Sequence, residues 1–147
     1  MFRRVFLVLA FVFFGVLPVL AECVPYTYTV GGLVSGYFEL SCDVCSSDGV
    51  FFTFDCDVVY SNFSNEPGLA INGRARLNAD YDYSDDYLTM NFDGGPVVVS
   101  YAGYSYNINF DNLYFEFDES GIVYYSGGIW IDDYYYPASD VLFGIFF

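Results

Sequence analysis

The chain has 147 residues, enough for one domain, and 55% of them are apolar while only 16% are charged, which excludes intrinsic disorder. Nineteen acidic residues outnumber four basic ones, and the net charge of −15 excludes nucleic acid as a partner. The sequence contains no His and no Lys, so a Ser-His-Asp triad, a Cys-His dyad, a Schiff base and a His-bound metal are excluded as well.

The first 21 residues have the features of a secretory signal peptide. A short basic start precedes an unbroken apolar run over residues 5–17. The short side chains of Val19 and Ala21, at the −3 and −1 positions, favour cleavage after Ala21. The run is shorter than the roughly 18–20 residues of a membrane anchor. We expect removal of residues 1–21, which leaves residues 22–147 as a single domain without a membrane span. Two basic residues against 19 acidic ones then give a net charge of −17.

Four cysteines follow the predicted signal peptide: Cys23, Cys42, Cys45 and Cys56. An even number predicts two disulfides in an oxidising compartment. We favour a Cys45–Cys56 or a Cys42–Cys56 bridge across a hairpin, with Cys23 bound to a remaining partner. Cys42 and Cys45 also have the spacing of a redox dithiol, but the residues after them do not predict the helix that such a site opens. A zinc site would need a second pair with this spacing.

Apolar and polar residues then alternate with a period of two, which predicts β-strands. The clearest alternation covers Tyr26–Val30, Leu88–Phe92 and Leu113–Phe117. Turn residues separate such runs at Gly31-Gly32, Ser47-Asp48-Gly49, Asp93-Gly94-Gly95-Pro96, Ala102-Gly103 and Glu119-Ser120-Gly121. No amphipathic helix is predicted after the signal peptide. We expect an all-β domain, an antiparallel meander of about nine strands that forms a sandwich or an open half-barrel.

Two short units recur along the strands. The first is an apolar residue, a small polar residue and glycine: Val34-Ser35-Gly36, Ile71-Asn72-Gly73 and Tyr125-Ser126-Gly127. The second, apolar-x-Phe-Asp, ends at Asp55, Asp93, Asp111 and Asp118. Two apolar side chains on one face point to a core, and the aspartate is suited to a turn or to solvent. Glycines inside strands indicate bulges, bends or a close backbone approach.

The order of these motifs resembles a known class. Cysteine, a Gly-rich turn and a strand ending near Cys56 are followed by Ile71-Asn72-Gly73, Ile108–Leu113 and Ser126-Gly127. The arrangement is similar to a loose class of mostly uncharacterised bacterial exported proteins with "lnG" and "tfdnl" β-repeats. The resemblance covers most of residues 34–131 and implies an exported all-β protein of a bacterial envelope. It brings no catalytic residues, and this chain is richer in Tyr and Phe than the class.

The acidic segment after the second glycine unit is a candidate calcium site, formed by Asp80, Asp82, Ser84 and Asp86. An extended strand places alternate side chains on one face, where their oxygens are suited to Ca²⁺. The EF-hand pattern is absent, because Asp85 replaces its glycine and Asn91 its bidentate glutamate. We favour the alternative, a solvated hairpin end with Tyr81 and Tyr83 packed beneath it.

The many tyrosines allow two interpretations. Exposed rings form a platform for a glycan or a protein, whereas the same rings on a buried face fill a core, which we favour. Asp132-Asp133 followed by Tyr134-Tyr135-Tyr136 is either an adhesive loop or, as we favour, a segment that covers a sheet edge.

The chain ends with apolar residues at alternate positions, Val141, Phe143, Ile145 and Phe147. This ending resembles the last strand of a small outer-membrane β-barrel, and aromatic girdles fit that class. However, eight spanning strands would use nearly all of residues 22–147, the last run is apolar on both faces, and cysteines are unexpected there. A buried last strand of a sandwich is the alternative.

These features predict an exported, non-enzymatic β-protein without a cofactor, with a binding, adhesion or structural role. We expect it to be secreted, periplasmic or at the cell surface, with an unidentified envelope or extracellular partner, a protein or a glycan. A glycosidase with two carboxylates is compatible with the composition, but no acidic pair stands out. The second functional hypothesis is a small outer-membrane β-barrel.

Overall fold

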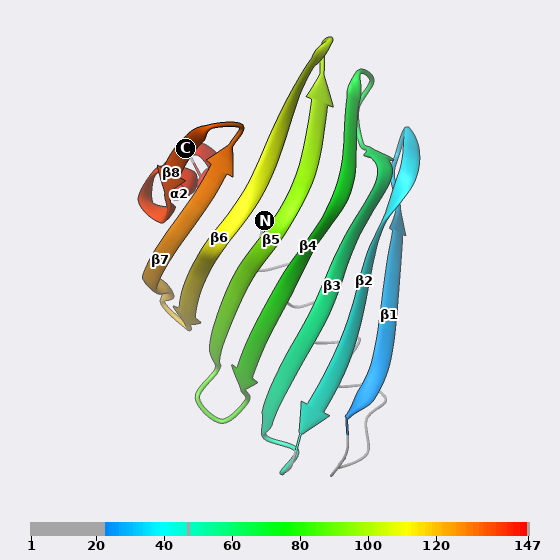
Figure 1. The fold of residues 1–147 in the computed structure, drawn as a ribbon. Coiled ribbons are helices and arrows are strands. Elements are labelled where there is room, and N and C mark those ends of the chain that lie inside the picture. Colours follow the sequence, from blue (N-terminus) through cyan, green and yellow to red (C-terminus); the bar gives the residue numbers. More distant parts are fainter. Residues whose placement is uncertain (1–22, 47, 147) are drawn as a thin grey trace.

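The computed structural model describes residues 23–46 and 48–146, so the predicted signal peptide lies outside the described residues. Eight strands and one short helix make up the described chain (Figure 1). The elements are β1 (Val24–Gly31), β2 (Ser35–Ser46), β3 (Phe51–Ser64), β4 (Leu69–Asp82), β5 (Tyr87–Tyr101), β6 (Tyr104–Asp118), β7 (Gly121–Ile131), β8 (Tyr134–Pro137) and α2 (Ala138–Phe146).

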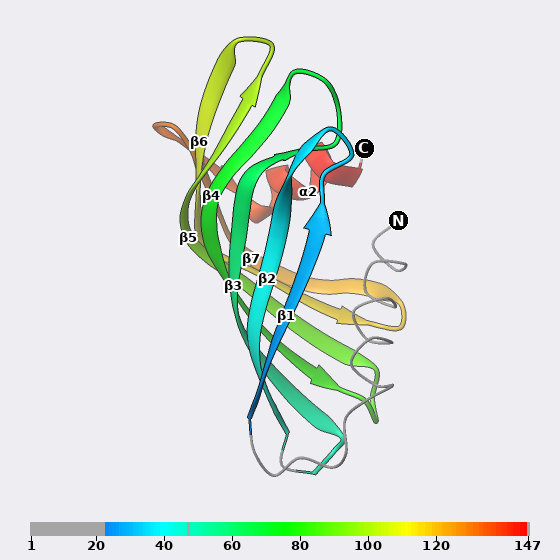
Figure 2. The same cartoon turned by 90° about the vertical axis from the view of Figure 1, so that its right-hand side faces the viewer.

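The strands form one antiparallel sheet, in which each strand pairs with the next one along the chain. The all-β prediction is therefore confirmed, with eight strands in place of about nine. The sheet is open, because β1 and β8 lie at its two edges. Of the two predicted arrangements, the structure matches the open half-barrel and not the sandwich. The sheet is curved, and α2 lies on its concave side (Figure 2).

The two faces of the sheet differ sharply in chemistry. On β1, half-buried Val24, Tyr26 and Tyr28 alternate with exposed Pro25 and Thr27. The same alternation continues across the sheet, since each strand aligns its apolar positions with those of its neighbour. The result is an apolar concave face and an opposite convex face rich in carboxylates.

Two clusters of buried side chains lie on the concave face. The first contains Leu40, Cys42, Val44, Cys56 and Val58 from β2 and β3, and the second contains Leu113, Phe115 and Ala138. Val141 and Leu142 of α2 pack on the second cluster, so the helix covers the concave face at β7 and β8.

The C-terminal helix corrects two predictions, the absence of helices and the last strand over residues 141–147. Pro137 ends β8 because proline has no amide hydrogen for a sheet. Asp140 lies in the first turn of α2, where the helix dipole favours a negative charge. Val141, Phe143 and Ile145, which suggested a strand, belong to the helix from Ala138 to Phe146, and Phe147 lies outside the described residues.

The cysteines form the disulfides Cys23–Cys45 and Cys42–Cys56, which agrees with the second of the two favoured pairings. Cys42 and Cys45 are three residues apart on one strand, so their side chains point to opposite faces. Cys42 lies in the buried cluster directly opposite Cys56, while Cys45 pairs with the residue before β1. The alternation of β2 therefore prevents a bond within the C-x-x-C sequence.

Four predicted turns connect strands as expected, at Gly31-Gly32, Ser47-Asp48-Gly49, Ala102-Gly103 and Glu119-Ser120-Gly121, although Ser47 itself lies outside the described residues. The fifth prediction, a turn at Asp93–Pro96, is wrong, because this segment lies inside β5. Register shifts on both sides of Gly94 absorb the glycines as β-bulges, and the strand continues in the same direction.

The repeated glycine units are also bulges. Gly36, Gly73 and Gly127 all have positive φ angles, of 64°, 119° and 73°, and each lies at a register shift. A Cβ on Gly127 would overlap the carbonyl oxygen of Asn112 on the neighbouring strand, where Asn112 itself has a positive φ of 46°. These paired bulges explain why glycine recurs in the interior of strands.

We expect Gly127→Ala to lower the free energy of unfolding by about 3 kcal/mol, because the methyl group adds a backbone clash to a left-handed conformation. Gly68→Ala is the matched control, since Gly68 has a φ of +85° and nothing within 4 Å of an added Cβ. That variant should lose only about 1 kcal/mol from its left-handed conformation. Urea unfolding measures both, and equal losses would contradict the bulge geometry.

Candidate functional site

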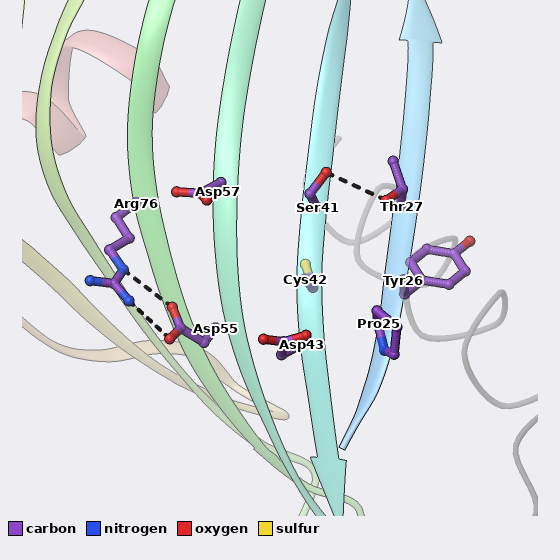
Figure 3. Close-up of a pocket in the computed structure, with 9 residues that line it drawn as sticks. All are labelled: Pro25, Tyr26, Thr27, Ser41, Cys42, Asp43, Asp55, Asp57 and Arg76. Carbon is purple, nitrogen blue, oxygen red and sulfur yellow. Dashed lines mark hydrogen bonds and ion pairs between the residues drawn. The ribbon is translucent and has the colours of Figure 1, made fainter.

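A shallow depression over β1–β4 is lined by Pro25, Tyr26, Thr27, Ser41, Cys42, Asp43, Asp55, Asp57 and Arg76 (Figure 3). Its charged side chains lie on the convex face, opposite the buried cluster that contains Cys42. Its volume is about 300 Å³. Arg76 donates from Nε to Oδ1 of Asp55 at 3.3 Å and from Nη2 to Oδ2 at 3.0 Å. This ion pair raises the pKa of Arg76. Both side chains are more than half exposed, so the pair adds little stability, and the depression remains negatively charged.

The candidate calcium residues lie at the β4–β5 hairpin. Oδ1 of Asp82 accepts hydrogen bonds from the backbone N–H of Ser84 at 2.9 Å and from its Oγ at 2.7 Å. These bonds lower the pKa of Asp82, the side-chain bond being the largest cause. Asp86 accepts a hydrogen bond from the hydroxyl of Tyr81 at 2.9 Å. Asp80 lies on β4, opposite Thr53 and Thr89.

These bonds are those of a hairpin end closed by its own side chains. Within residues 23–46 and 48–146, no group of three or more His, Cys, Asp or Glu side chains is placed to hold a metal ion. Calcium binding by Asp80, Asp82, Ser84 and Asp86 stays a prediction.

The convex face changes character over β5–β8, where aromatic rings lie beside carboxylates. Glu116 accepts hydrogen bonds from two tyrosine hydroxyls, that of Tyr87 and that of Tyr114, the latter at 2.9 Å. Tyr114 in turn contacts the ring of Tyr124 edge-on, with 6.0 Å between ring centroids. One carboxylate thus binds two tyrosines, and a third ring, that of half-exposed Tyr124, packs against Tyr114.

A second aromatic group lies further along β7. Trp130 packs against Tyr135 of β8 with 5.2 Å between ring centroids, and its Nε1 donates to Oδ2 of Asp111 at 3.4 Å. An added Cβ on Gly128 would lie 2.7 Å from the hydroxyl of Tyr135. Because residue 128 has no side chain, the tyrosine ring lies over the strand beside Trp130. Both rings remain about two-fifths exposed, at 41% and 43%.

Both aromatic groups lie on the same face of the sheet. On β7, the positions that face away from α2 are those of Tyr124, Ser126, Gly128 and Trp130. The bulge at Gly127 does not move any of these side chains to the other face, because its extra residue is on β6, where Asn112 has a positive φ. We call these two groups together the aromatic face: Tyr87, Tyr114, Glu116, Tyr124, Asp111, Trp130 and Tyr135.

Sequence reasoning found this face only in part. The tyrosine segment at residues 134–136 forms the edge strand β8, as the favoured interpretation expected. Asp132 closes the β7–β8 turn by accepting two hydrogen bonds from Asn107, each 3.0 Å long. Trp130 was not identified as a candidate, although its position between Ile129 and Ile131 indicates a side chain on the face opposite the core.

No helix in the described part of the chain is long and apolar enough to cross a membrane. Comparisons with protein-family models, with curated proteins and with solved structures find no match to this chain.

The hydrogen bond to Glu116 raises the pKa of Tyr87 to about 12 from its usual 10.0. The folded pKa lies above the unfolded one, so the bond stabilises the fold fully below pH 10 and is lost as the pH rises through 12. We expect Glu116→Gln to lower the pKa of Tyr87 toward 10, as measured by the absorbance of tyrosinate during a pH titration. The control variant Glu119→Gln should leave this pKa unchanged. An unchanged titration in Glu116→Gln would contradict this contact.

Proposed function

We propose that the chain is an exported, non-enzymatic protein of the cell envelope or cell surface that binds a partner through its convex face. The two disulfides support an extracellular or periplasmic location, because such bonds persist in oxidising compartments. The predicted signal peptide over residues 1–21 supplies the route out of the cytoplasm.

The observation that carries the binding role is the aromatic face on β5–β8. Rings that are half exposed and held in place by carboxylates offer a large contact area, and they lose little conformational freedom on binding. The sequence has no His and no Lys, which excludes the nucleophilic mechanisms that depend on these two residues. Recognition without chemistry is the function that these groups support best.

Export is tested by producing the full chain in a secretion-competent host. We expect the protein outside the cytoplasm, with Glu22 as its first residue and without reactive thiols. Val12→Arg is the control, because a charge in the apolar run should leave the chain uncleaved in the cytoplasm with its cysteines reduced. Cytoplasmic accumulation of the unmodified chain, with the same uncleaved N-terminus as the variant, would disprove the proposal.

A further inference from the structure

We propose that the aromatic face binds a neutral glycan chain, an inference that rests on the proposed function and names its ligand. Two aromatic groups lie on one face of the sheet, one at Tyr114 and Tyr124 and the other at Trp130 and Tyr135. Each group has a carboxylate beside it, Glu116 in the first and Asp111 in the second.

Sugar rings match this combination of groups. One side of a pyranose presents C–H groups that stack on an aromatic ring, and its edge presents hydroxyls that donate to carboxylates. At the second group, Trp130 and Tyr135 supply rings, and Asp111 supplies acceptor oxygens within hydrogen-bond distance of the indole. Gly128 has no side chain, so the ring of Tyr135 lies over this strand, side by side with Trp130.

The charge of the protein selects the kind of glycan. After removal of residues 1–21, two basic residues stand against 19 acidic ones, and both of them, Arg74 and Arg76, lie on β4. The aromatic face itself carries Asp111 and Glu116 with no basic residue on its strands β5–β8. A glycan with carboxylate or sulfate groups is repelled by this surface, whereas a neutral one is not.

The same carboxylates argue against a protein partner. The centres of protein–protein interfaces are depleted in charged residues, because a buried carboxylate loses its hydration. Here Glu116 lies among the tyrosines of the first group, and Asp111 lies beside Trp130 in the second. Sugar hydroxyls replace the lost water with hydrogen bonds, so a glycan meets this pattern better than an apolar protein surface does.

The distance between the two groups indicates a chain rather than a single sugar. Tyr124 and Trp130 are six residues apart on β7, and a strand rises by about 3.3 Å per residue, so about 20 Å separate them. Ser126 and Gly128 are the residues between them on this face, and the ring of Tyr135 lies over Gly128. An extended glycan several sugars long is able to contact both groups.

Trp130 is the one tryptophan of the sequence, so its fluorescence reports directly on the proposed site. The exported chain is titrated with cellohexaose, chitohexaose and mannohexaose, and with an oligogalacturonate of equal length as the anionic probe. We expect a saturable change in Trp130 emission with at least one neutral probe and none with the anionic one. Tyr135→Ala should weaken that binding about tenfold, and calorimetry should give the same for Trp130→Ala.

Tyr134→Ala is the matched control, because Tyr134 is the adjacent residue on β8, is 73% exposed and points to the other face. Its affinity should equal that of the unmodified protein, and near-ultraviolet circular dichroism confirms that each variant is folded. Equal weakening by Tyr134→Ala and Tyr135→Ala would overturn the assignment to this face, as would tighter binding of the oligogalacturonate.

Isolated cell envelopes separate this inference from the proposed function. We expect the exported protein to sediment with them. If cellohexaose or mannohexaose binds, periodate, which cleaves vicinal diols, should abolish the sedimentation; if only chitohexaose binds, free chitohexaose should abolish it by competition, because the inner sugars of that chain have no vicinal diol. Sedimentation that survives periodate, together with no response to the three neutral probes, would overturn the glycan and leave the binding function standing. A protein that neither sediments with envelopes nor binds the probes would contradict both.

Discussion

The alternation of side chains in one unlayered sheet determines nearly every other feature of this protein. In a sheet of eight strands in sequence order, each side chain points to one of two faces. The register between neighbouring strands decides which of their side chains share a face. The apolar set gathers on the concave face, where α2 adds Ala138, Val141 and Leu142. The carboxylates are left on the convex face, where they remain hydrated.

Several of these carboxylates also accept hydrogen bonds from specific partners in the protein. Asp118 accepts hydrogen bonds from the side chain and backbone of Ser120, and these bonds lower its pKa. Glu116 and Asp111 instead accept from aromatic side chains and hold their rings on the convex face. A chain with so few basic residues therefore satisfies its acids with backbone, hydroxyl and indole donors, and the aromatic face is one result.

The sequence predicts the parts of this structure that depend on local period and turn chemistry. Period-two alternation identifies the all-β fold, and the turn residues Ala102-Gly103 identify a hairpin. The segment Asp93–Pro96 shows the limit, because the same residues that form turns also form bulges, and only the pairing with β4 and β6 decides between them.

The C-terminal helix and the aromatic face depend on long-range packing, which the sequence does not display. A short apolar run such as residues 141–147 is compatible with either the period of a strand or that of a helix. Packing against Leu113 and Phe115 favours the helix. Trp130 lies beside Tyr135 and Asp111 only because β6, β7 and β8 are neighbours in the sheet. Its own strand pattern gives the direction of the side chain but not these partners.

Disulfide mapping by peptide mass spectrometry, on the exported protein and without reduction, is the most direct test of the two-faced sheet. The account predicts the pairs Cys42–Cys56 and Cys23–Cys45, since Cys42 and Cys45 point to opposite faces of β2. A bond between Cys42 and Cys45, or between Cys45 and Cys56, would show that β2 does not alternate as described and would contradict the account.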